Sequence, residues 1–485
     1  MFYGRQAGSR VCASCGGCRW LGETVLIIVC GILCSGWDMV VFGQVLSRTA
    51  QEDRQLMLER LGITKMRAGF SADPSAPNHA NYDEERAGPF SPLPPLLVCE
   101  DGSMVTTKEE WWERRRPEII RLLEKEVYGC VPDNVPGVSW RVVSEQELTV
   151  GEIAVRQWLV EGTADNSRYP EVEVKIPLVV GVPVAPGPPV PVLMMFSPFV
   201  GGQPPGGAGR FRPPGPLRQE IVVRAGWGYA LLNPNTVQPD NGAGLSRGII
   251  GLTNQGRPRD PEQWGALRAW AWGASRALDF LETLPEVDAG RVAIEGVSRY
   301  GKAALVTMAF DTRFAAALVG SAGAGGVKLF RRNFGEAVEN LAGTGEYHWM
   351  AGNFLKYAAE ESVFGRKTAD DLPVDTHQLL ALCAPRLVFI SYGVPERGDA
   401  LWLDQRGSFM AAVAAQPAWH LYGDVGLGLP AGELRQPMPA VNNGLLEGRL
   451  AWRQHDGGHT TYPNLPVFLQ WANRHFAGAA LPTTH

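Results

Sequence analysis

The sequence predicts an α/β fold in which a mostly parallel sheet lies between two layers of helices. Four β-like runs between residues 139 and 197 are spaced like the strands of an antiparallel meander. From residue 226 onward, short apolar runs alternate with segments of helical periodicity, and this alternation is typical of parallel βα units. A serine turn, "EGVSRYGKAAL" at residues 295–305, joins a predicted strand to a predicted helix in the middle of this series.

The composition fits a soluble globular enzyme. The 485 residues are 45% hydrophobic and 20% charged, which is enough for one large domain with additions or for two domains. The net charge is −5, and the basic run Arg114–Arg116 lies in a helix-like segment, where a solvated helix face explains it. We therefore expect no nucleic-acid partner.

Residues 1–43 resemble a secretory signal peptide. The segment 24–43 is apolar apart from Asp38, follows three arginines, and ends in small residues before Gln44. Its apolar core before Ser35 is shorter than the roughly 20 residues that a membrane span needs. We expect the leader to be cleaved from a secreted or periplasmic protein, and a retained membrane anchor is the alternative.

Five of the eight cysteines lie in this leader. Cleavage leaves Cys99, Cys130 and Cys383, which allow one bridge but no disulfide framework. The leader sequence "CASCGGC" (residues 12–18) has no fourth ligand nearby, so we do not expect a zinc site there. We expect neither a metal nor another cofactor.

Two segments of different character follow the leader. Residues 44–95 are polar and rich in Pro and Asn, and they predict an irregular N-terminal extension without a core of its own. The predicted catalytic domain, residues 96–485, opens with a helix from Thr107 to Tyr128, because glutamates occupy its first turn and Gly129 follows its last.

The remaining elements are predicted in order along the chain. The four meander strands cover residues 139–150, 153–162, 172–183 and 190–197. The later series comprises strand 226–234, helix 260–284, strand 291–296, helix 302–310, strand 314–321, strand 385–393, helix 405–416, strand 450–455 and helix 462–476.

Ser298 lies at the corner between strand 291–296 and the next helix. Such a corner holds a serine hydroxyl above the sheet, and Gly296 and Gly301 let neighbouring backbone pass close by. The N–H of Arg299 would then lie at a helix N-terminus, where it can stabilise an oxyanion. The alternative is a serine that only caps the helix. An antiparallel start followed by parallel βα units with this turn describes an α/β-hydrolase, a three-layer sandwich.

A catalytic histidine and acid should follow the serine along the chain. His459, after strand 450–455 and before the last helix, has the expected place. His455 is the nearest competitor, with a solvated or structural role expected, and His377 is expected to be structural. The acid should follow strand 385–393, where we favour Asp399 and keep two alternatives. These alternatives are Asp404, which also fits a helix N-cap, and Glu396.

These residues resemble the glucuronoyl esterases, carbohydrate esterase family 15, and especially their bacterial branch. The family motif G-x-S-R-x-G-K is matched by Gly296, Ser298, Arg299, Gly301 and Lys302. Six further stretches are similar and cover most of the chain from residue 81 onward: "NYDEERAGPF", "WWERRRPEIIRLLEKEVYG", "WGALRAWAWGASRALDFL", "RRNFGEAVENL", "EYHWM" and "DALWLDQRG".

The resemblance implies a role for each matched residue. Ser298 would be the nucleophile and His459 the general base, while Arg299 would stabilise the oxyanion. The alternatives for Arg299 are a surface charge and a salt-bridge partner. Lys302 and Glu336 would bind hydroxyls of a uronic acid ring. A lysine that only extends to solvent is the alternative for Lys302.

Trp402 would lie against the sugar, whereas Trp349 and His348 are expected in the core. In many members of the family the triad glutamate follows the next strand, where this sequence has Ser321. The acid must then come from the later position. There Asp399 stands three residues before Trp402, one more than is usual in the family.

The implied activity is hydrolysis of esters of glucuronic or 4-O-methylglucuronic acid, as a carboxylic ester hydrolase of the 4-O-methyl-glucuronoyl methylesterase type. In plant cell walls such esters join glucuronoxylan to lignin alcohols, and the enzyme would act as a monomer. Two alternatives remain: another carbohydrate esterase of this fold, of the acetyl ester or dienelactone type, and a catalytically impaired carbohydrate-binding relative.

Overall fold

The computed structural model describes residues 48–89, 91–184, 187–198, 216–430 and 433–478. The leader predicted over residues 1–43 lies outside these ranges. Among the described residues, no helix is long and apolar enough to cross a membrane.

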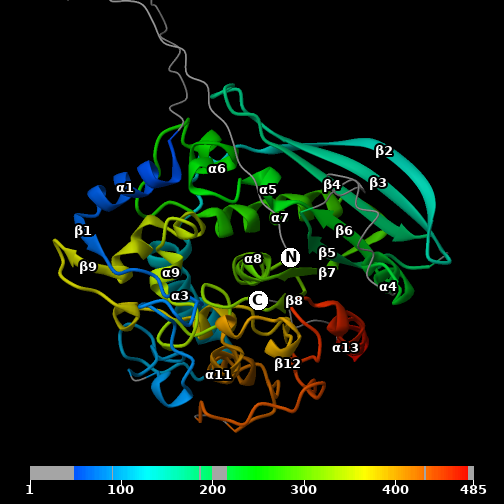
Figure 1. Ribbon diagram of the computed structural model, residues 1–485. Helices are drawn as coiled ribbons and strands as arrows, with labels where there is room; N and C mark the ends of the chain where they lie inside the picture. Colours follow the sequence, from blue (N-terminus) through cyan, green and yellow to red (C-terminus); the bar gives the residue numbers. More distant parts are fainter. Residues whose placement is uncertain (1–47, 90, 185–186, 199–215, 431–432, 479–485) are drawn as a thin grey trace, which may run out of the picture. The chain divides into compact units, whose positions relative to one another are not determined.

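A ten-stranded sheet forms the centre of the described part of the chain (Figure 1). Its strand order is β11-β12-β10-β8-β7-β5-β6-β4-β3-β2. The strands are β2 (Val138–Val150), β3 (Ile153–Ala164), β4 (Lys175–Pro183), β5 (Val190–Phe196), β6 (Gly228–Leu232), β7 (Val287–Val297), β8 (Ala316–Gly320), β10 (Leu387–Tyr392), β11 (Gly444–Leu445) and β12 (Leu450–Gln454). From β6 to β12 the neighbouring strands are parallel, so the predicted mostly parallel sheet is confirmed.

The antiparallel part at the beginning of the sheet has one strand fewer than predicted. Strands β2, β3 and β4 form the predicted meander, which Figure 1 shows as a long curved ribbon. Strand β5 does not continue it, but lies parallel between β6 and β7. Residues 192–196 of β5 are all buried, as is typical of a strand with helices on both faces, and the sequence did not alternate there as a meander strand would.

Helices cover both faces of the sheet. On one face α4 and α13 pack together against β5 and β10, and Figure 1 shows them side by side. On the other face α3, α7, α8, α10 and α11 enclose the larger core. The helices are α1 (Ala50–Arg60), α2 (Lys108–Glu110), α3 (Arg116–Leu123), α4 (Arg218–Arg224), α5 (Pro234–Val237), α6 (Gly248–Thr253), α7 (Ala266–Leu281), α8 (Arg299–Phe310), α9 (Val338–Leu341), α10 (Thr376–Ala381), α11 (Gln405–Ala415), α12 (Pro417–His420) and α13 (Leu465–Gly478).

The helix predicted over residues 107–128 is present, with two π-helical stretches. It runs through α2, the stretch η2 (Trp111–Arg115), α3 and the stretch η3 (Glu124–Tyr128). Thr107 and Glu110 form a capping box at its start, and Gly129, at φ 84°, ends it.

The segment predicted to be irregular, residues 44–95, contains regular structure. Helix α1 begins with a capping box of Thr49 and Glu52, and strand β1 (Ile63–Met66) pairs with β9 (Ala359–Ser362). Met57 and Leu58 are buried in the main core, although seven of the eleven residues of α1 are polar. The helix depends on these tertiary contacts, which its local composition does not reveal.

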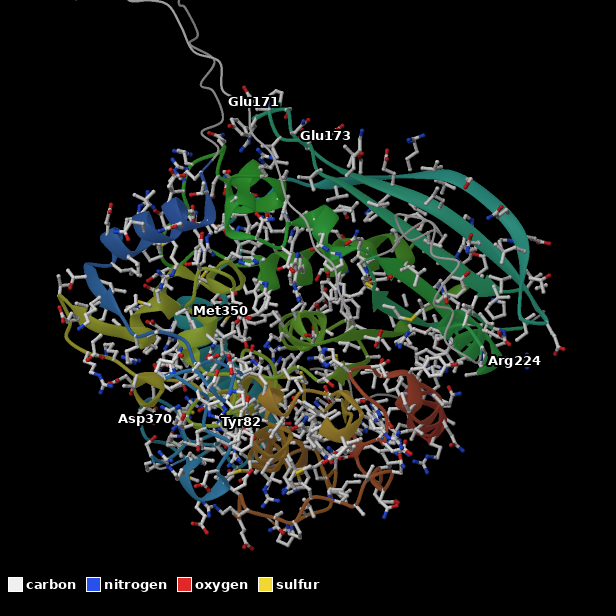
Figure 2. All side chains as sticks on the ribbon, viewed as in Figure 1. Tyr82, Glu171, Glu173, Arg224, Met350 and Asp370 are labelled. Carbon is white, nitrogen blue, oxygen red and sulfur yellow. The ribbon has the colours of Figure 1, made fainter. Side chains whose placement is uncertain are left out.

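Side-chain burial follows the expected pattern. Figure 2 shows Glu171 and Glu173 in the connection from β3 to β4, and both are exposed, while Val172 between them is buried. The three cysteines within the described residues, Cys99, Cys130 and Cys383, are free thiols.

Candidate active site

Ser298 occupies a strained corner between β7 and α8. Its backbone has φ 61° and ψ −129°, a conformation that a non-glycine residue rarely adopts, and its N–H donates to the carbonyl of Gly320 at 2.9 Å. Strain of this kind is typical of a serine held above the sheet for reaction.

The spacing of the two glycines follows from close backbone contacts. A Cβ on Gly296 would lie 2.1 Å from the carbonyl oxygen of Tyr300, in the turn itself. A Cβ on Gly301 would lie 2.5 Å from the carbonyl oxygen of Gly320, at the end of β8. The later glycine is therefore required where α8 crosses the neighbouring strand, which explains its place one residue beyond that in G-x-S-x-G.

Asp399 and His459 are hydrogen-bonded to each other. Oδ1 of the buried Asp399 lies 2.7 Å from Nδ1 of His459, whose ring is partly open to solvent. The other carboxylate oxygen accepts hydrogen bonds from the backbone N–H of Gly393 and from Oγ of Ser321, both at 2.7 Å. Ser321, where the family pattern has a glutamate, thus supports the aspartate.

The loops that carry Asp399 and His459 are joined through backbone contacts. The N–H of Val394 donates to the carbonyl of Gly457 at 2.9 Å. A Cβ on Gly458 would lie 2.3 Å from the carbonyl oxygen of Arg397, so only glycine allows this approach. The histidine and the acid are consequently held as one unit.

The loop of His459 is also anchored to β7, the strand that precedes Ser298. Thr461, two residues after His459, donates a hydrogen bond to Oε1 of Glu295 at 2.6 Å. Glu295 is buried in β7, three residues before Ser298, and it also pairs with Arg218. This network fixes the loop of His459 beside the serine turn.

The other candidate acids and histidines have different partners. Asp404 caps α11 by accepting from Gly407 at 2.8 Å and pairs with the buried Arg332 at 2.8 Å. Glu396 is exposed. His455 contacts the carbonyl of Thr460, in the turn that holds His459, and thus has a structural position.

His377 is buried against the carbonyl of Pro94, and burial lowers its pKa to about 4. The position of His377 matches the expected structural role. The structure therefore places only Asp399, among the three candidate acids, against the predicted histidine.

Arg299 extends from the turn to an aspartate that the sequence analysis did not single out. Its guanidinium pairs with Asp240 at 2.6 Å and lies over the ring of Trp349 at 5.6 Å. Asp240 also accepts from Trp349 at 2.7 Å and lies 3.0 Å from Nε2 of His348. Burial alone would raise the pKa of Asp240, but the hydrogen bonds from His348, Trp349 and Arg299 outweigh it and hold the pKa at about 2.

Lys302 is buried and does not extend to solvent. Its ammonium pairs with the carboxylate of Glu336 at 3.0 Å and donates to the carbonyl of Ala324. The carboxylate of Glu336 also accepts from the N–H of Ala324 at 2.8 Å. A Cβ on Gly323 would lie 2.5 Å from the same carboxylate, so the missing side chain leaves the space that the pair occupies.

Glu346 is a second carboxyl near this pair and was missed from the sequence. Its Oε2 atom is buried and has no hydrogen-bond partner among the described residues. Burial and repulsion from Glu336 raise the pKa of Glu346 to about 7. Glu346 belongs to the stretch "EYHWM", which resembles the family, but a glutamate before a short helix has no chemical signature of its own.

The two tryptophans take different places. Trp402 is partly exposed, and its carbonyl accepts a hydrogen bond from the N–H of Glu336 at 2.9 Å. Trp349, expected in the core, is indeed buried, but its ring also faces the cations of Arg299 and Lys302, at 5.6 and 5.7 Å. The ring of Trp349 thus contacts both the cation paired with Asp240 and the cation paired with Glu336.

The fold and this arrangement define an α/β-hydrolase, with a serine, a histidine and an aspartate following the parallel strands β7, β12 and β10. The family model of fungal glucuronyl esterases matches residues 259–423. A solved glucuronoyl esterase of carbohydrate esterase family 15, from Teredinibacter turnerae T7901, is 42% identical with a TM-score of 0.79, and the match covers 88% of this chain and 100% of that one. The chain belongs to carbohydrate esterase family 15, the glucuronoyl esterases.

Two further relatives agree with this membership. A carbohydrate esterase, MZ0003, from an unknown prokaryotic organism is 30% identical over 433 residues, which are 83% of this chain and 94% of the relative. The solved glucuronoyl esterase from Solibacter usitatus is 31% identical with a TM-score of 0.67, over 81% of this chain and 99% of that one. The predicted family and fold class are confirmed.

Within the described residues, no group of three or more histidine, cysteine, aspartate or glutamate side chains could hold a metal ion.

Proposed function

We propose that this protein hydrolyses esters of glucuronic or 4-O-methylglucuronic acid through an acyl-enzyme on Ser298. The observation that carries the proposal is the buried ion pair of Lys302 and Glu336. Lys302 lies in α8, one helical turn after Ser298. An ordinary esterase has no need of a buried ion pair there, because burying two charges costs free energy. A ring with several hydroxyls gives both groups hydrogen-bonding partners.

The reaction begins with proton transfer from Ser298 to Nε2 of His459 while Oγ attacks the ester carbonyl carbon. Asp399, through its contact with Nδ1 at 2.7 Å, orients the imidazole and stabilises the imidazolium. Arg299, held by Asp240, stabilises the oxyanion together with its own backbone N–H at the start of α8. The imidazolium then protonates the leaving alcohol, and a water molecule hydrolyses the acyl-enzyme by the same steps.

Recognition of the acyl half is assigned to the side of Ser298 that faces β8. Lys302 would donate to ring hydroxyls, and Glu336 and Glu346 would accept from them. Trp402, from the loop after β10, would supply a face for the ring. The names of the relatives support this substrate class, since the curated relative from Cerrena unicolor, 27% identical over 339 residues, is a 4-O-methyl-glucuronoyl methylesterase.

The test compares the methyl ester of glucuronic acid with acetylated xylan. The wild-type protein should hydrolyse the first much faster, and Ser298→Ala should abolish this activity, whereas Ser144→Ala on the exposed face of β2 should not change it. Faster hydrolysis of acetylated xylan would favour the acetyl esterase alternative. Activity that survives Ser298→Ala would reject the mechanism.

We also propose that the protein acts outside the cytoplasm, on glucuronoxylan esters of lignin alcohols, as a monomer. The signal-like leader over residues 1–43 supports export. Expression of the full chain, followed by N-terminal sequencing of the secreted product, tests this proposal. A product that stays in the cytoplasm with the leader attached would contradict it.

A further inference from the structure

Helix α1 lies against the two segments that support Asp240, the partner of Arg299. One segment is the short helix η4 (Gly242–Ser246), which begins two residues after Asp240 and packs against α1. The other is the stretch of residues 347–349, which a hydrogen bond joins to α1. An element that precedes the predicted catalytic domain therefore contacts the support of the proposed oxyanion arginine.

Tyr347 connects α1 with the side chains that bind Asp240. Its hydroxyl lies 3.0 Å from Oδ2 of Asp53 and 3.0 Å from the first carbonyl oxygen of α1, and it donates its hydrogen to these two acceptors. Both Asp53 and Tyr347 are buried. The next two residues, His348 and Trp349, contact Asp240 at 3.0 and 2.7 Å. The contact with α1 thus fixes the stretch directly before these two side chains.

The hydroxyl of Tyr347 also fits closely against the segment of Asp240. A Cβ on Gly242 would lie 2.4 Å from this hydroxyl oxygen and 2.8 Å from Cβ of Ala50, so only glycine allows the approach. Asn241, between Asp240 and Gly242, caps η4 with its side chain. Helix α1, η4 and Tyr347 therefore meet at one point, two residues from the carboxylate of Asp240.

The far end of the stretch is held by a buried arginine that Asp53 also influences. Arg259 donates to the carbonyls of Trp264 and Met350, at 2.9 and 2.8 Å, and Met350 directly follows Trp349. Burial lowers the pKa of Arg259, and the charge of Asp53 opposes this change. Asp53 thus supports the stretch at both ends.

The direction of the Arg299 guanidinium depends on this support. The side chain is about half exposed, and Asp240 is the single ion-pair partner that the described residues offer it. The ring of Trp349, at 5.6 Å, is its other neighbour of opposite polarity. Both contacts come from the segments that α1 holds together. A misplacement of about 1 Å at a catalytic group can cost about 100-fold in rate.

We propose that Asp53 in α1 is a positioning residue for catalysis, which acts through Tyr347 and Asp240 on the guanidinium of Arg299. The inference rests on the proposed function, which assigns stabilisation of the oxyanion to Arg299. It adds that a helix outside the predicted catalytic domain belongs to the catalytic unit.

The test measures kcat and KM for the methyl ester of glucuronic acid. Asp53→Ala and Tyr347→Phe should each lower kcat about 5-fold and leave KM within about twofold, because the oxyanion forms only after the substrate has bound. Asp53→Asn keeps an acceptor for the hydroxyl of Tyr347 and should retain at least about half of kcat. Gln51→Ala, exposed on α1, is the matched control and should change neither value.

A double-mutant cycle with Arg299→Ala separates positioning from a general loss of stability. Without the guanidinium, Asp53→Ala has no such group to displace, so it should lower kcat by no more than about 1.5-fold. A further loss of about 5-fold in this background would overturn the inference, because it would show that Asp53 does not act through Arg299. An unchanged kcat in Tyr347→Phe, which keeps the ring and its packing, would overturn it even where Asp53→Ala does not fold.

Other results would remove the proposed function instead. A wild-type protein that does not hydrolyse the methyl ester would reject the esterase activity, and an unchanged kcat in Arg299→Ala would reject the oxyanion role. The inference falls with either result. An active wild type and a slow Arg299→Ala leave the proposed function standing, whatever the variants of Asp53 and Tyr347 show.

Discussion

Replacement of Glu346 by glutamine should make the stability of the protein less dependent on pH. Glutamine has the shape of glutamate but never ionises. In the folded protein, burial and the neighbouring Glu336 raise the pKa of Glu346 from its ordinary value of 4.5 to about 7. The folded state therefore holds this proton more tightly than the unfolded chain does.

The sign and the size of the effect follow from this difference. Below a pH of about 4.5, Glu346 is protonated in both states and costs nothing. Between about 4.5 and 7 the unfolded chain releases its proton first, so stability falls as the pH rises. Since one pKa unit corresponds to about 1.4 kcal/mol, the loss above pH 7 is at most about 3 kcal/mol.

The assay is denaturant unfolding of wild type and Glu346→Gln at about pH 4.5 and about pH 8. The variant should match the wild type at the lower pH and exceed it by up to about 3 kcal/mol at the higher pH. Glu396→Gln, on an exposed loop, is the control and should show no such change. A pH dependence identical in wild type and Glu346→Gln would refute the reasoning.

Four further substitutions, two of them combined, test other contacts of the site. Ser321→Ala removes a hydrogen bond to the carboxylate of Asp399, so it should cost about 1.5–3 kcal/mol of stability and lower kcat; an unchanged unfolding midpoint would contradict this. Asp240→Asn should reduce kcat about 10-fold with little change in KM, because Arg299 loses the charge that holds it; steady-state kinetics with an unaltered kcat would exclude this role. Lys302→Met should lower the free energy of unfolding by about 3–5 kcal/mol, because it leaves the buried carboxylate of Glu336 unpaired. Adding Glu336→Leu should restore much of this stability. A double variant less stable than Lys302→Met would count against a simple ion pair.

The sequence was sufficient for the elements whose signals are local. The serine turn, the strands β6, β7, β8, β10 and β12, and the capped helix after Thr107 could be recognised from periodicity, glycine placement and capping residues. Strand β5 was assigned to the right residues but to the wrong neighbours, because pairing partners are chosen by burial on both faces.

The parts of the site that could not be predicted depend on long-range contacts. Asp240 and Glu346 lie in segments without any catalytic motif, and only the fold brings them toward Arg299 and the pair with Glu336. Asp399 could be favoured over Asp404 from its position alone, but no local pattern indicated that Asp404 would form an ion pair with Arg332. Helix α1 was not predicted, because only a few apolar residues bury it against the core and they form no clear helical pattern.

The hydrogen bond between Ser321 and Asp399 has a consequence for how the site can change. Residue 321 follows β8 and residue 399 follows β10, and the two strands are neighbours, so side chains from either one reach the same point beside His459. The requirement at that point is for a carboxylate, whichever strand supplies it. An acidic side chain after β8 and one after β10 are therefore alternatives for one place beside the histidine, and both at once would set two carboxylates against each other.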